Sequence, residues 1–271
     1  MWTSFPLLAI LTLVPAQQPP ATTLSFTNIR TTHGQLGGTR QITTLLPGDG
    51  YYVAFDIEGI VVDPVGRVSY TMAMEVTDKA GKPIIKQDPA ERKDYAPLGG
   101  GKIPARAYID LAHDQAPGEY TMKVSVADKL GGASKSIEQK FTVGAKEFGI
   151  VRVHTTVDAG ALIQAPTTGI IGQTVFVQFM LVGFGRDPVM KQPSVVLEML
   201  PFDETGKPTI QKPNALAVDS GVPESEPVFT VRFLLPMTRV GKFTVQLKAT
   251  DKLTGKVSTF NLPITVMAPA N

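Results

Sequence analysis

The chain has 271 residues with 26 basic and 24 acidic side chains, which leaves a formal net charge of +2. Such a balance lacks the strong positive excess that binding to a phosphate backbone requires, so we expect no nucleic-acid partner. The sequence contains no cysteine, which excludes thiol catalysis, iron–sulfur clusters and cysteine-ligated zinc. The length is sufficient for two domains that each bury a core of their own.

The first residues are typical of a secretory signal peptide. Residues 5–14 form an apolar run too short to span a bilayer, and the small-residue pattern Val14-Pro15-Ala16 closes it. No Lys or Arg precedes the run, which departs from the usual pattern. We predict a signal peptide over residues 1–16 and a flexible leader over residues 17–23. The mature protein is then exported to the periplasm, the cell surface or the extracellular space, without a membrane span.

Short segments that alternate apolar and polar residues predict β-strands, and turns rich in Gly, Pro and Asp separate them. In the first part of the chain we expect strands near residues 24–32, 50–59, 68–77, 82–87, 104–112, 118–127 and 134–143. The alternation along the central strands of both parts of the chain predicts six core residues, namely Phe55, Met122, Val124, Phe179, Val245 and Leu247.

The second part of the chain repeats the first. The repeated blocks are residues 48–64, 78–83 and 118–143, which recur as residues 172–188, 203–208 and 241–266. A duplication of this length predicts two tandem domains of one fold, over residues 24–145 and 146–271, held in contact by a short linker. The expected strands of the second domain lie near residues 148–157, 174–183, 194–202, 208–212, 227–235, 241–250 and 256–266. Seven short strands per domain predict an all-β protein of two immunoglobulin-like (fibronectin-type) antiparallel β-sandwiches.

Residues 118–128 read Gly-x-Tyr-Thr-x-x-Val-x-Val-x-Asp. This pattern resembles the late strands of bacterial immunoglobulin-like and PKD-like modules, and Tyr120 matches the tyrosine corner, whose hydroxyl bonds back to upstream backbone. Met122 stands where antibody-type domains have their second cysteine, and Phe243 of the second copy lacks the hydroxyl. The resemblance implies spacer, adhesion or accessory modules without catalytic residues.

The histidines do not have the spacing of a catalytic or metal site. His33, His113 and His154 form no zinc-hydrolase motif, and no nucleophile-elbow motif occurs in the chain. We expect His154 to face solvent, because the first copy has Arg30 at that position. The chain is therefore expected to be neither an enzyme nor dependent on a cofactor, with a dispersed Ser–His–Asp site as the less favoured alternative.

Acidic residues recur at the ends of strands and gather in one loop. The four strand-ending aspartates are Asp78, Asp128, Asp203 and Asp251. Each precedes a nearby Gly, which favours hydrogen bonds from the turn backbone to the side chain. The loop group comprises Asp110, His113, Asp114 and Glu119. Oxygen-rich loops of this kind can bind calcium, but the second copy lacks the group. We therefore expect solvated carboxylates and keep a calcium site near Asp110 and Asp114 as the alternative.

The segment over residues 88–103 is the candidate binding loop. It carries Arg92, Lys93 and Tyr95, and the matching stretch over residues 213–226 differs in composition. Loops that diverge on a shared scaffold are where binding usually resides, although a tolerated connection explains the same pattern. Tyr95 is also the only tyrosine expected in a loop, so it is the one candidate for a sugar-stacking platform.

These features predict a function in binding rather than in catalysis. We expect an exported, non-catalytic structural or binding protein that acts through protein–protein contact at the cell envelope or matrix, with an envelope or extracellular protein as its partner. The alternative is a polysaccharide-binding accessory protein of a secreted hydrolase.

Overall fold

The structure is a computed structural model that describes residues 23–41 and 44–270. These residues form β-strands joined by turns, and none of the described segments is a helix long and apolar enough to cross a membrane. The all-β prediction is confirmed. The predicted signal peptide (residues 1–16) and most of the predicted leader (residues 17–23) lie outside the described residues.

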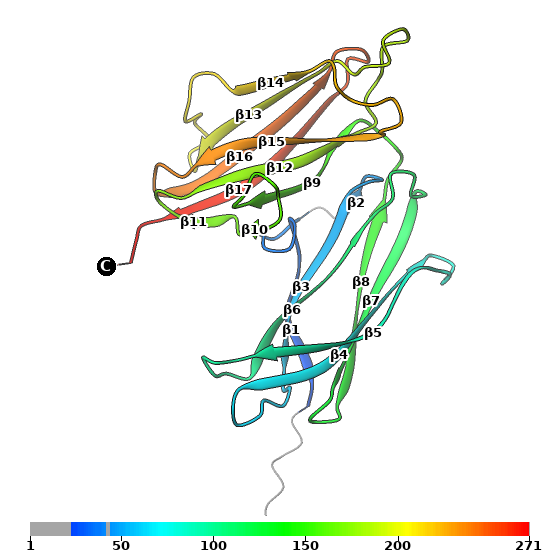
Figure 1. Cartoon of the computed structure of the whole chain (residues 1–271), viewed down its shortest axis with the longest axis vertical. Helices are drawn as coiled ribbons and strands as arrows, with labels where there is room; N and C mark the ends of the chain where they lie inside the picture. The colour runs from blue at the N-terminus through cyan, green and yellow to red at the C-terminus, as the bar shows by residue number, and fades with distance from the viewer. Residues whose placement is uncertain (1–22, 42–43, 271) are drawn as a thin grey trace, which may run out of the picture.

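The N-terminal half (residues 23–145) contains two sheets (Figure 1). The three-stranded sheet has the order β1-β3-β6, formed by β1 (Ser25–Thr32), β3 (Gly50–Glu58) and β6 (Lys102–Asp110). The five-stranded sheet has the order β2-β8-β7-β4-β5, formed by β2 (Thr44–Leu45), β4 (Arg67–Asp78), β5 (Pro83–Tyr95), β7 (Gly118–Asp128) and β8 (Ser134–Val143). The pairings are antiparallel, except that β2 runs parallel to β8.

The C-terminal half (residues 146–270) has two sheets of the same strand order, apart from the short additional strand β10. The order β10-β9-β12-β15 joins β9 (Gly149–Thr156), β10 (Gln164–Ala165), β12 (Thr174–Val182) and β15 (Val228–Pro236). The order β11-β17-β16-β13-β14 joins β11 (Thr168–Ile170), β13 (Val195–Asp203), β14 (Asn214–Val218), β16 (Gly241–Asp251) and β17 (Val257–Met267).

Each half buries one hydrophobic core, and both of its sheets contribute side chains to that core. Strand β6 illustrates the origin of this packing, because its side chains alternate strictly between exposed and buried positions. All six residues predicted for the core are at most 2% exposed, namely Phe55, Met122, Val124, Phe179, Val245 and Leu247. This prediction is confirmed.

The predicted turn caps are present in both halves. Asp78 Oδ1 accepts hydrogen bonds from the backbone N–H groups of Ala80 and Lys82, both at 2.9 Å, and Asp203 Oδ1 does the same in the matching turn. Asp128 Oδ2 accepts from the N–H of Val61 at 2.9 Å, and Asp251 Oδ2 accepts from the N–H of Gly185 at 2.8 Å. Asp128 and Asp251 therefore each hold a neighbouring loop, which contains Val61 or Gly185, against their own turn.

A left-handed residue also recurs in the first strand of each half. Asn28 in β1 and Arg152 in β9 both have φ of +51°, and the pairing register shifts at each position. The shift marks a β-bulge, which bends the strand and redirects its side chains. The bulge residue of the C-terminal half is central to the contact between the halves described below.

Two of the predicted strands differ from the structure, and three short strands, β2, β10 and β11, were not predicted. Strand β5 continues to Tyr95, whereas we predicted its end near residue 87. It lies at a sheet edge with nearly every side chain exposed, so charged residues carry no burial cost there. The register shifts next to Pro89, where no N–H is available for the ladder. In the C-terminal half, the fourth strand was predicted near residues 208–212 but is β14, Asn214–Val218, which begins directly after Pro213.

Candidate functional site

The structure places the three candidate binding residues on a strand rather than in a loop. Arg92, Lys93 and Tyr95 belong to β5, the edge strand that pairs with β4. Because side chains alternate along a strand, Lys93 and Tyr95 lie on one face of β5 and Arg92 lies on the other. The structure therefore brings Lys93 and Tyr95 together and separates Arg92 from them.

Lys93 and Tyr95 line an open groove of about 720 Å³, which we call the distal groove. Its walls come from β4, the end of β5 and two neighbouring loops: Asp63, Val65, Arg67, Val68, Ser69, Lys93, Asp94, Tyr95 and Leu130. Val65, Tyr95 and Leu130 are 58%, 63% and 52% exposed. Apolar side chains that are this exposed and this close together mark a surface for contact with another molecule.

Hydrogen bonds fix one wall of the distal groove. Asp63 Oδ1 accepts from the N–H groups of Val65 and Arg67 at 3.0 and 2.8 Å, and Asp63 Oδ2 accepts from Arg67 Nε at 2.7 Å. The bond from the Arg67 backbone is the main cause that holds the pKa of Asp63 below its usual range. Gly66 has φ of +85°, and a Cβ there would lie 3.1 Å from Cε2 of Tyr95. Glycine therefore lets the tyrosine ring lie against this turn.

The opposite wall is held by strand pairing and by one buried phenol. The Tyr70 hydroxyl of β4 donates to Asp94 Oδ2 of β5 at 2.8 Å. Burial raises the pKa of Tyr70, so its hydroxyl remains a donor at neutral pH. Lys93 Nζ lies 3.6 Å from Glu91 Oε1 on the exposed strand, where such a pair stays solvated. The distal groove thus combines exposed apolar side chains with paired charges on a fixed backbone.

A second feature is the contact between the two halves, which we call the joint. Arg152, in the bulge of β9, donates its backbone N–H to Asp49 Oδ1 at 2.8 Å and its Nε to the Gly48 carbonyl at 2.7 Å. Its guanidinium also donates to the Leu111 carbonyl at 3.2 Å and lies 3.5 Å from Asp110 Oδ2. One residue of the C-terminal half therefore holds the end of the N-terminal half through several charged or backbone groups.

The loop that follows β1 forms a further part of the joint. The backbone N–H groups of Gln35 and Gly38 donate to Gln164 Oε1 at 2.7 Å and to Thr167 Oγ1 at 3.0 Å. These bonds cross from one half to the other, as do ring contacts: His33 meets Phe260 edge to face, with ring centroids 5.1 Å apart.

Both histidines of the joint are half-buried. The pKa of His33 is lowered to about 4, mainly by burial and in addition by the charge of Arg40. Burial also lowers the pKa of His154, whose Cβ lies against Gly34 of the other half. The prediction that His154 faces solvent is therefore wrong, because the N-terminal half packs on that part of β9.

The acidic loop of the N-terminal half faces a positive side chain rather than an open cation site. Asp110 lies beside the Arg152 guanidinium and accepts a hydrogen bond from the Tyr52 hydroxyl at 3.3 Å. Within residues 23–41 and 44–270, no three His, Cys, Asp or Glu side chains gather as metal ligands. Arg152 already supplies the positive charge beside Asp110, so the geometry gives no support to a calcium site near Asp110 and Asp114.

The residues of the joint were not predicted from the sequence, because they lie at positions that the two halves do not share. Arg152 corresponds to Asn28 in the N-terminal half, and Asp49 corresponds to Gln173 in the C-terminal half. The joint therefore lies where the two halves differ. A difference in charge at otherwise matched positions is the signal that could have indicated it.

The tyrosine corner and a stack of rings close the core of the N-terminal half next to the joint. The Tyr120 hydroxyl donates to the Ala116 carbonyl at 2.7 Å and accepts from Gln115 Nε2 at 2.9 Å, so the predicted bond to upstream backbone is confirmed. The Tyr120 ring stacks on Phe141 with centroids 5.5 Å apart, and Phe141 stacks on Tyr51 at 4.4 Å.

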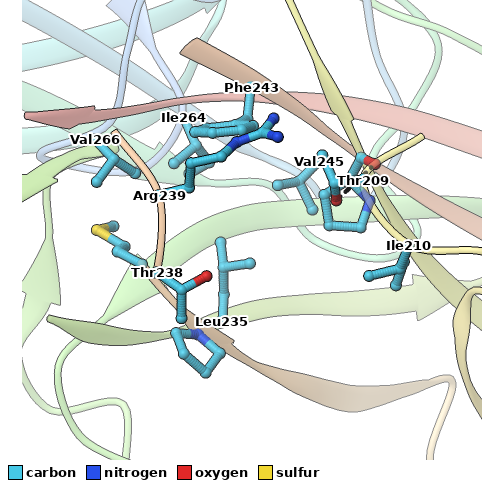
Figure 2. Close-up of a pocket in the computed structure, with 12 residues that line it drawn as sticks. Thr209, Ile210, Leu235, Thr238, Arg239, Phe243, Val245, Ile264 and Val266 are labelled. Atoms are coloured by element: carbon cyan, nitrogen blue, oxygen red, sulfur yellow. Dashed lines mark hydrogen bonds between the residues drawn. The ribbon is translucent and has the colours of Figure 1, made fainter. Parts of the chain in front are cut away.

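The corresponding end of the C-terminal half is hollow (Figure 2). A pocket of about 270 Å³, which we call the apolar pocket, opens there among β15, β16 and β17. Its lining residues are Pro201, Thr209, Ile210, Leu235, Pro236, Met237, Thr238, Arg239, Phe243, Val245, Ile264 and Val266. The Arg239 guanidinium lies over the Phe243 ring, 5.0 Å from its centroid, and 3.7 Å from Asp203 Oδ2.

Comparison with known proteins adds little to this geometry. No family model and no curated protein matches the chain. Among solved structures, the Pseudomonas fluorescens alkylpurine DNA glycosylase AlkC bound to DNA containing an abasic site analog aligns at 13% identity, with a TM-score of 0.29. The alignment covers 46% of this chain and 31% of the glycosylase. A likeness this weak carries no argument about fold or activity.

Proposed function

We propose that the chain consists of two immunoglobulin-like β-sandwich domains related by duplication, over residues 24–145 and 146–271, exported by a signal peptide over residues 1–16. The shared strand order supports this proposal, as does the bulge that recurs at Asn28 and Arg152. The matching hydrogen bonds of Asp128 and Asp251 to neighbouring loops support it further. Bulges and side-chain caps are specific features that two unrelated sandwiches seldom share at matching positions.

We further propose that the protein is non-catalytic and acts by contact with another protein of the cell envelope or matrix. The observation that carries this proposal is the distal groove, where exposed Val65, Tyr95 and Leu130 surround one open surface. The groove lies at the end of the N-terminal half away from the joint (Figure 1). The joint fixes the opposite end of this half, so the groove projects from a stiff two-domain body toward a partner.

A protein partner fits the chemistry of the distal groove better than a polysaccharide does. Aliphatic side chains beside a tyrosine and paired charges are typical of protein interfaces, where apolar anchors are desolvated and charged groups lie at the rim. The alternative, recognition of a polysaccharide, rests on one observation: the Tyr95 ring is 63% exposed and could stack on a sugar. The aliphatic neighbours Val65 and Leu130 offer a sugar no hydrogen bonds, and the polar side chains of Asp63, Arg67 and Asp94 are already bonded within the chain.

The test compares binding of the full chain and its variants to cell-envelope proteins and to an array of glycans. Tyr95→Ala and Leu130→Ser each remove one exposed apolar side chain of the groove. We expect each to reduce the amount of captured envelope protein about tenfold or more, as loss of an interface anchor does. Tyr108→Ala is the matched control, since Tyr108 is a 43% exposed tyrosine that stacks on Tyr52 outside the groove. This control should bind as the unchanged chain does.

The two candidate functions give different results in this experiment. A glycan that binds the unchanged chain and is lost with Tyr95→Ala would replace the proposed function by its alternative. Capture of envelope protein that neither groove variant alters would show that the distal groove is not the contact surface.

A further inference from the structure

The C-terminal half lacks the rings that close the same end of the N-terminal core. Tyr120 and Phe141 face each other across strands β7 and β8, and the matching cross-strand pair of β16 and β17 is Phe243 with Ile264. The third ring, Tyr51, is the second residue of β3, and its counterpart at the second position of β12 is Val175. Two of the three stacked rings are thus replaced by smaller aliphatic side chains.

The apolar pocket lies beside Phe243 and Ile264, the counterparts of Tyr120 and Phe141, which both line it. Its inner wall consists of Val245, Ile264 and Val266, which belong to the hydrophobic core and are at most 4% exposed. Figure 2 shows Ile264 and Phe243 on one side of the hollow and Leu235 on the other. Protein cores are packed to the density of organic crystals, so an unfilled space lined by such side chains favours an apolar occupant.

The mouth of the apolar pocket has polar groups that could orient an occupant. The Arg239 side chain is 58% exposed, and its nearest carboxylate oxygen, on Asp203, is 3.7 Å away. This separation is longer than a hydrogen bond, so the guanidinium N–H groups of Arg239 can donate to a carbonyl or hydroxyl oxygen. Thr209 lies at the same mouth and is exposed.

The matching end of the N-terminal half is already a protein contact. There Gly48, Asp49 and Leu111 bind Arg152 of the C-terminal half. In the C-terminal half the corresponding end faces outward, away from the joint (Figure 1). Exposed aliphatic residues flank the pocket, since Ile210 is 44% exposed and Val240, next to Arg239, is 49% exposed. A partner protein could cover these residues, whereas a free small molecule would leave them in water.

We propose that the apolar pocket binds an aromatic side chain, Tyr or Phe, presented by a partner protein. The ring replaces the volume that Phe141 provides in the N-terminal half, and Arg239 donates to the partner's backbone carbonyl or phenolic oxygen. This is a second contact site, in the other half of the molecule from the distal groove, and it does not depend on that groove.

The test uses NMR titration of the full chain with p-cresol and with tyrosine blocked as its N-acetyl N-methylamide. We expect saturable shifts of the amide signals of Phe243, Val245 and Ile264, with a Kd on the order of 1 mM for a single ring. The blocked tyrosine should bind more tightly than p-cresol, because its backbone carbonyls reach Arg239. N-acetyl-leucine N-methylamide should bind at least several-fold more weakly.

Two variants close the pocket in different ways. Ile264→Phe restores the ring of the N-terminal half and should weaken binding of both probes at least tenfold. Thr209→Trp places a large ring over the mouth of the pocket from an exposed position. It should also weaken binding of both probes, and it provides this test if Ile264→Phe does not fold. Leu216→Phe is the control, since it adds a ring to exposed strand β14 outside the lining and should leave binding unchanged.

Each alternative result decides against part of the proposal. Shifts that are absent, or that persist unchanged in Ile264→Phe and Thr209→Trp, would show that the pocket binds no aromatic ring. Binding of p-cresol at least as tight as that of the blocked tyrosine would assign the pocket to a free aromatic molecule and overturn the protein partner.

Discussion

Tyr120 and Phe243 occupy equivalent positions in the two halves but differ by one hydroxyl group. In the N-terminal half that hydroxyl donates to the Ala116 carbonyl at 2.7 Å. Tyr120→Phe should therefore lower the free energy of unfolding by about 0.5–1.5 kcal/mol, the net contribution of one hydrogen bond. Urea unfolding of the full chain, followed by a signal specific to the N-terminal half, measures this change.

The reverse exchange is the control for the tyrosine corner. Phe243→Tyr should not stabilise the C-terminal half, because Arg239 and Val240 replace Ala116 and Pro117 in the approach to the turn. If Tyr120→Phe is neutral, or if Phe243→Tyr stabilises by the same amount, the corner bond does not contribute to stability.

Phe55 tests the packing of the first core. It is 1% exposed and meets Phe26 edge to face, with centroids 5.3 Å apart. Phe55→Ala should destabilise the N-terminal half by about 3–5 kcal/mol, the usual cost of deleting a buried aromatic ring. Tyr95→Ala, at an exposed position, should cost less than about 0.5 kcal/mol in the same denaturant titration. A loss below about 1 kcal/mol for Phe55→Ala would contradict its central place in the core.

At the scale of elements, the loop over residues 33–40 makes the joint sensitive to acid. The folded-state pKa of His33 is about 4 and its usual value is 6.5, so between these values the unfolded chain binds more protons. Stability contributed by neutral His33 is complete above pH 6.5 and is lost as the pH falls toward 4. The loss should amount to about 1–3 kcal/mol.

The titration of carboxylates also changes stability with pH, but it does so equally in the unchanged chain and in His33→Gln. The difference in the free energy of unfolding between these two proteins at each pH therefore reports the contribution of His33 alone. Charged groups near the two joint histidines are Arg40 and Asp49 for His33, and Arg152 and Asp110 for His154. Denaturant unfolding between pH 4 and 7 should show a shallower pH dependence for His33→Gln. Parallel pH profiles for the two proteins would show that His33 does not titrate in this range.

The elements also show which structural information the sequence contains. Alternation on central strands located Phe55 and Leu247 in the cores, because burial on one face imposes a period of two. The same criterion predicted the end of β5 too early. This edge strand is held by backbone pairing with β4 and tolerates charged side chains on both faces, so it shows no alternation. The distal groove was only partly predictable: Lys93 and Tyr95 were selected, but their neighbours Val65 and Leu130 come from loops far away in the sequence.

At the scale of the whole molecule, Arg152 determines whether the two halves move together. Arg152→Ala removes the side-chain hydrogen bonds to the Gly48 and Leu111 carbonyls and leaves Asp110 without its cation. The backbone N–H bond to Asp49 can persist, so we expect a loss of about 1–3 kcal/mol. Small-angle X-ray scattering should show a larger radius of gyration for this variant as the joint opens.

Arg186→Ala provides the control for the joint. Arg186 donates to the carbonyls of Lys191, Val222, Pro223 and Glu226, all within the C-terminal half. Its loss should destabilise these loops while leaving the scattering curve unchanged. Equal scattering curves for Arg152→Ala and the unchanged chain would mean that the remaining contacts hold the joint without this side chain.

The most direct test of the proposed function is photo-crosslinking from the distal groove in the intact cell envelope. A photoreactive phenylalanine analogue that replaces Tyr95 should crosslink to one protein of defined mass, and the same analogue in place of Tyr108 should not. A crosslink of equal yield from both positions, or none from position 95, would contradict a protein contact through the distal groove.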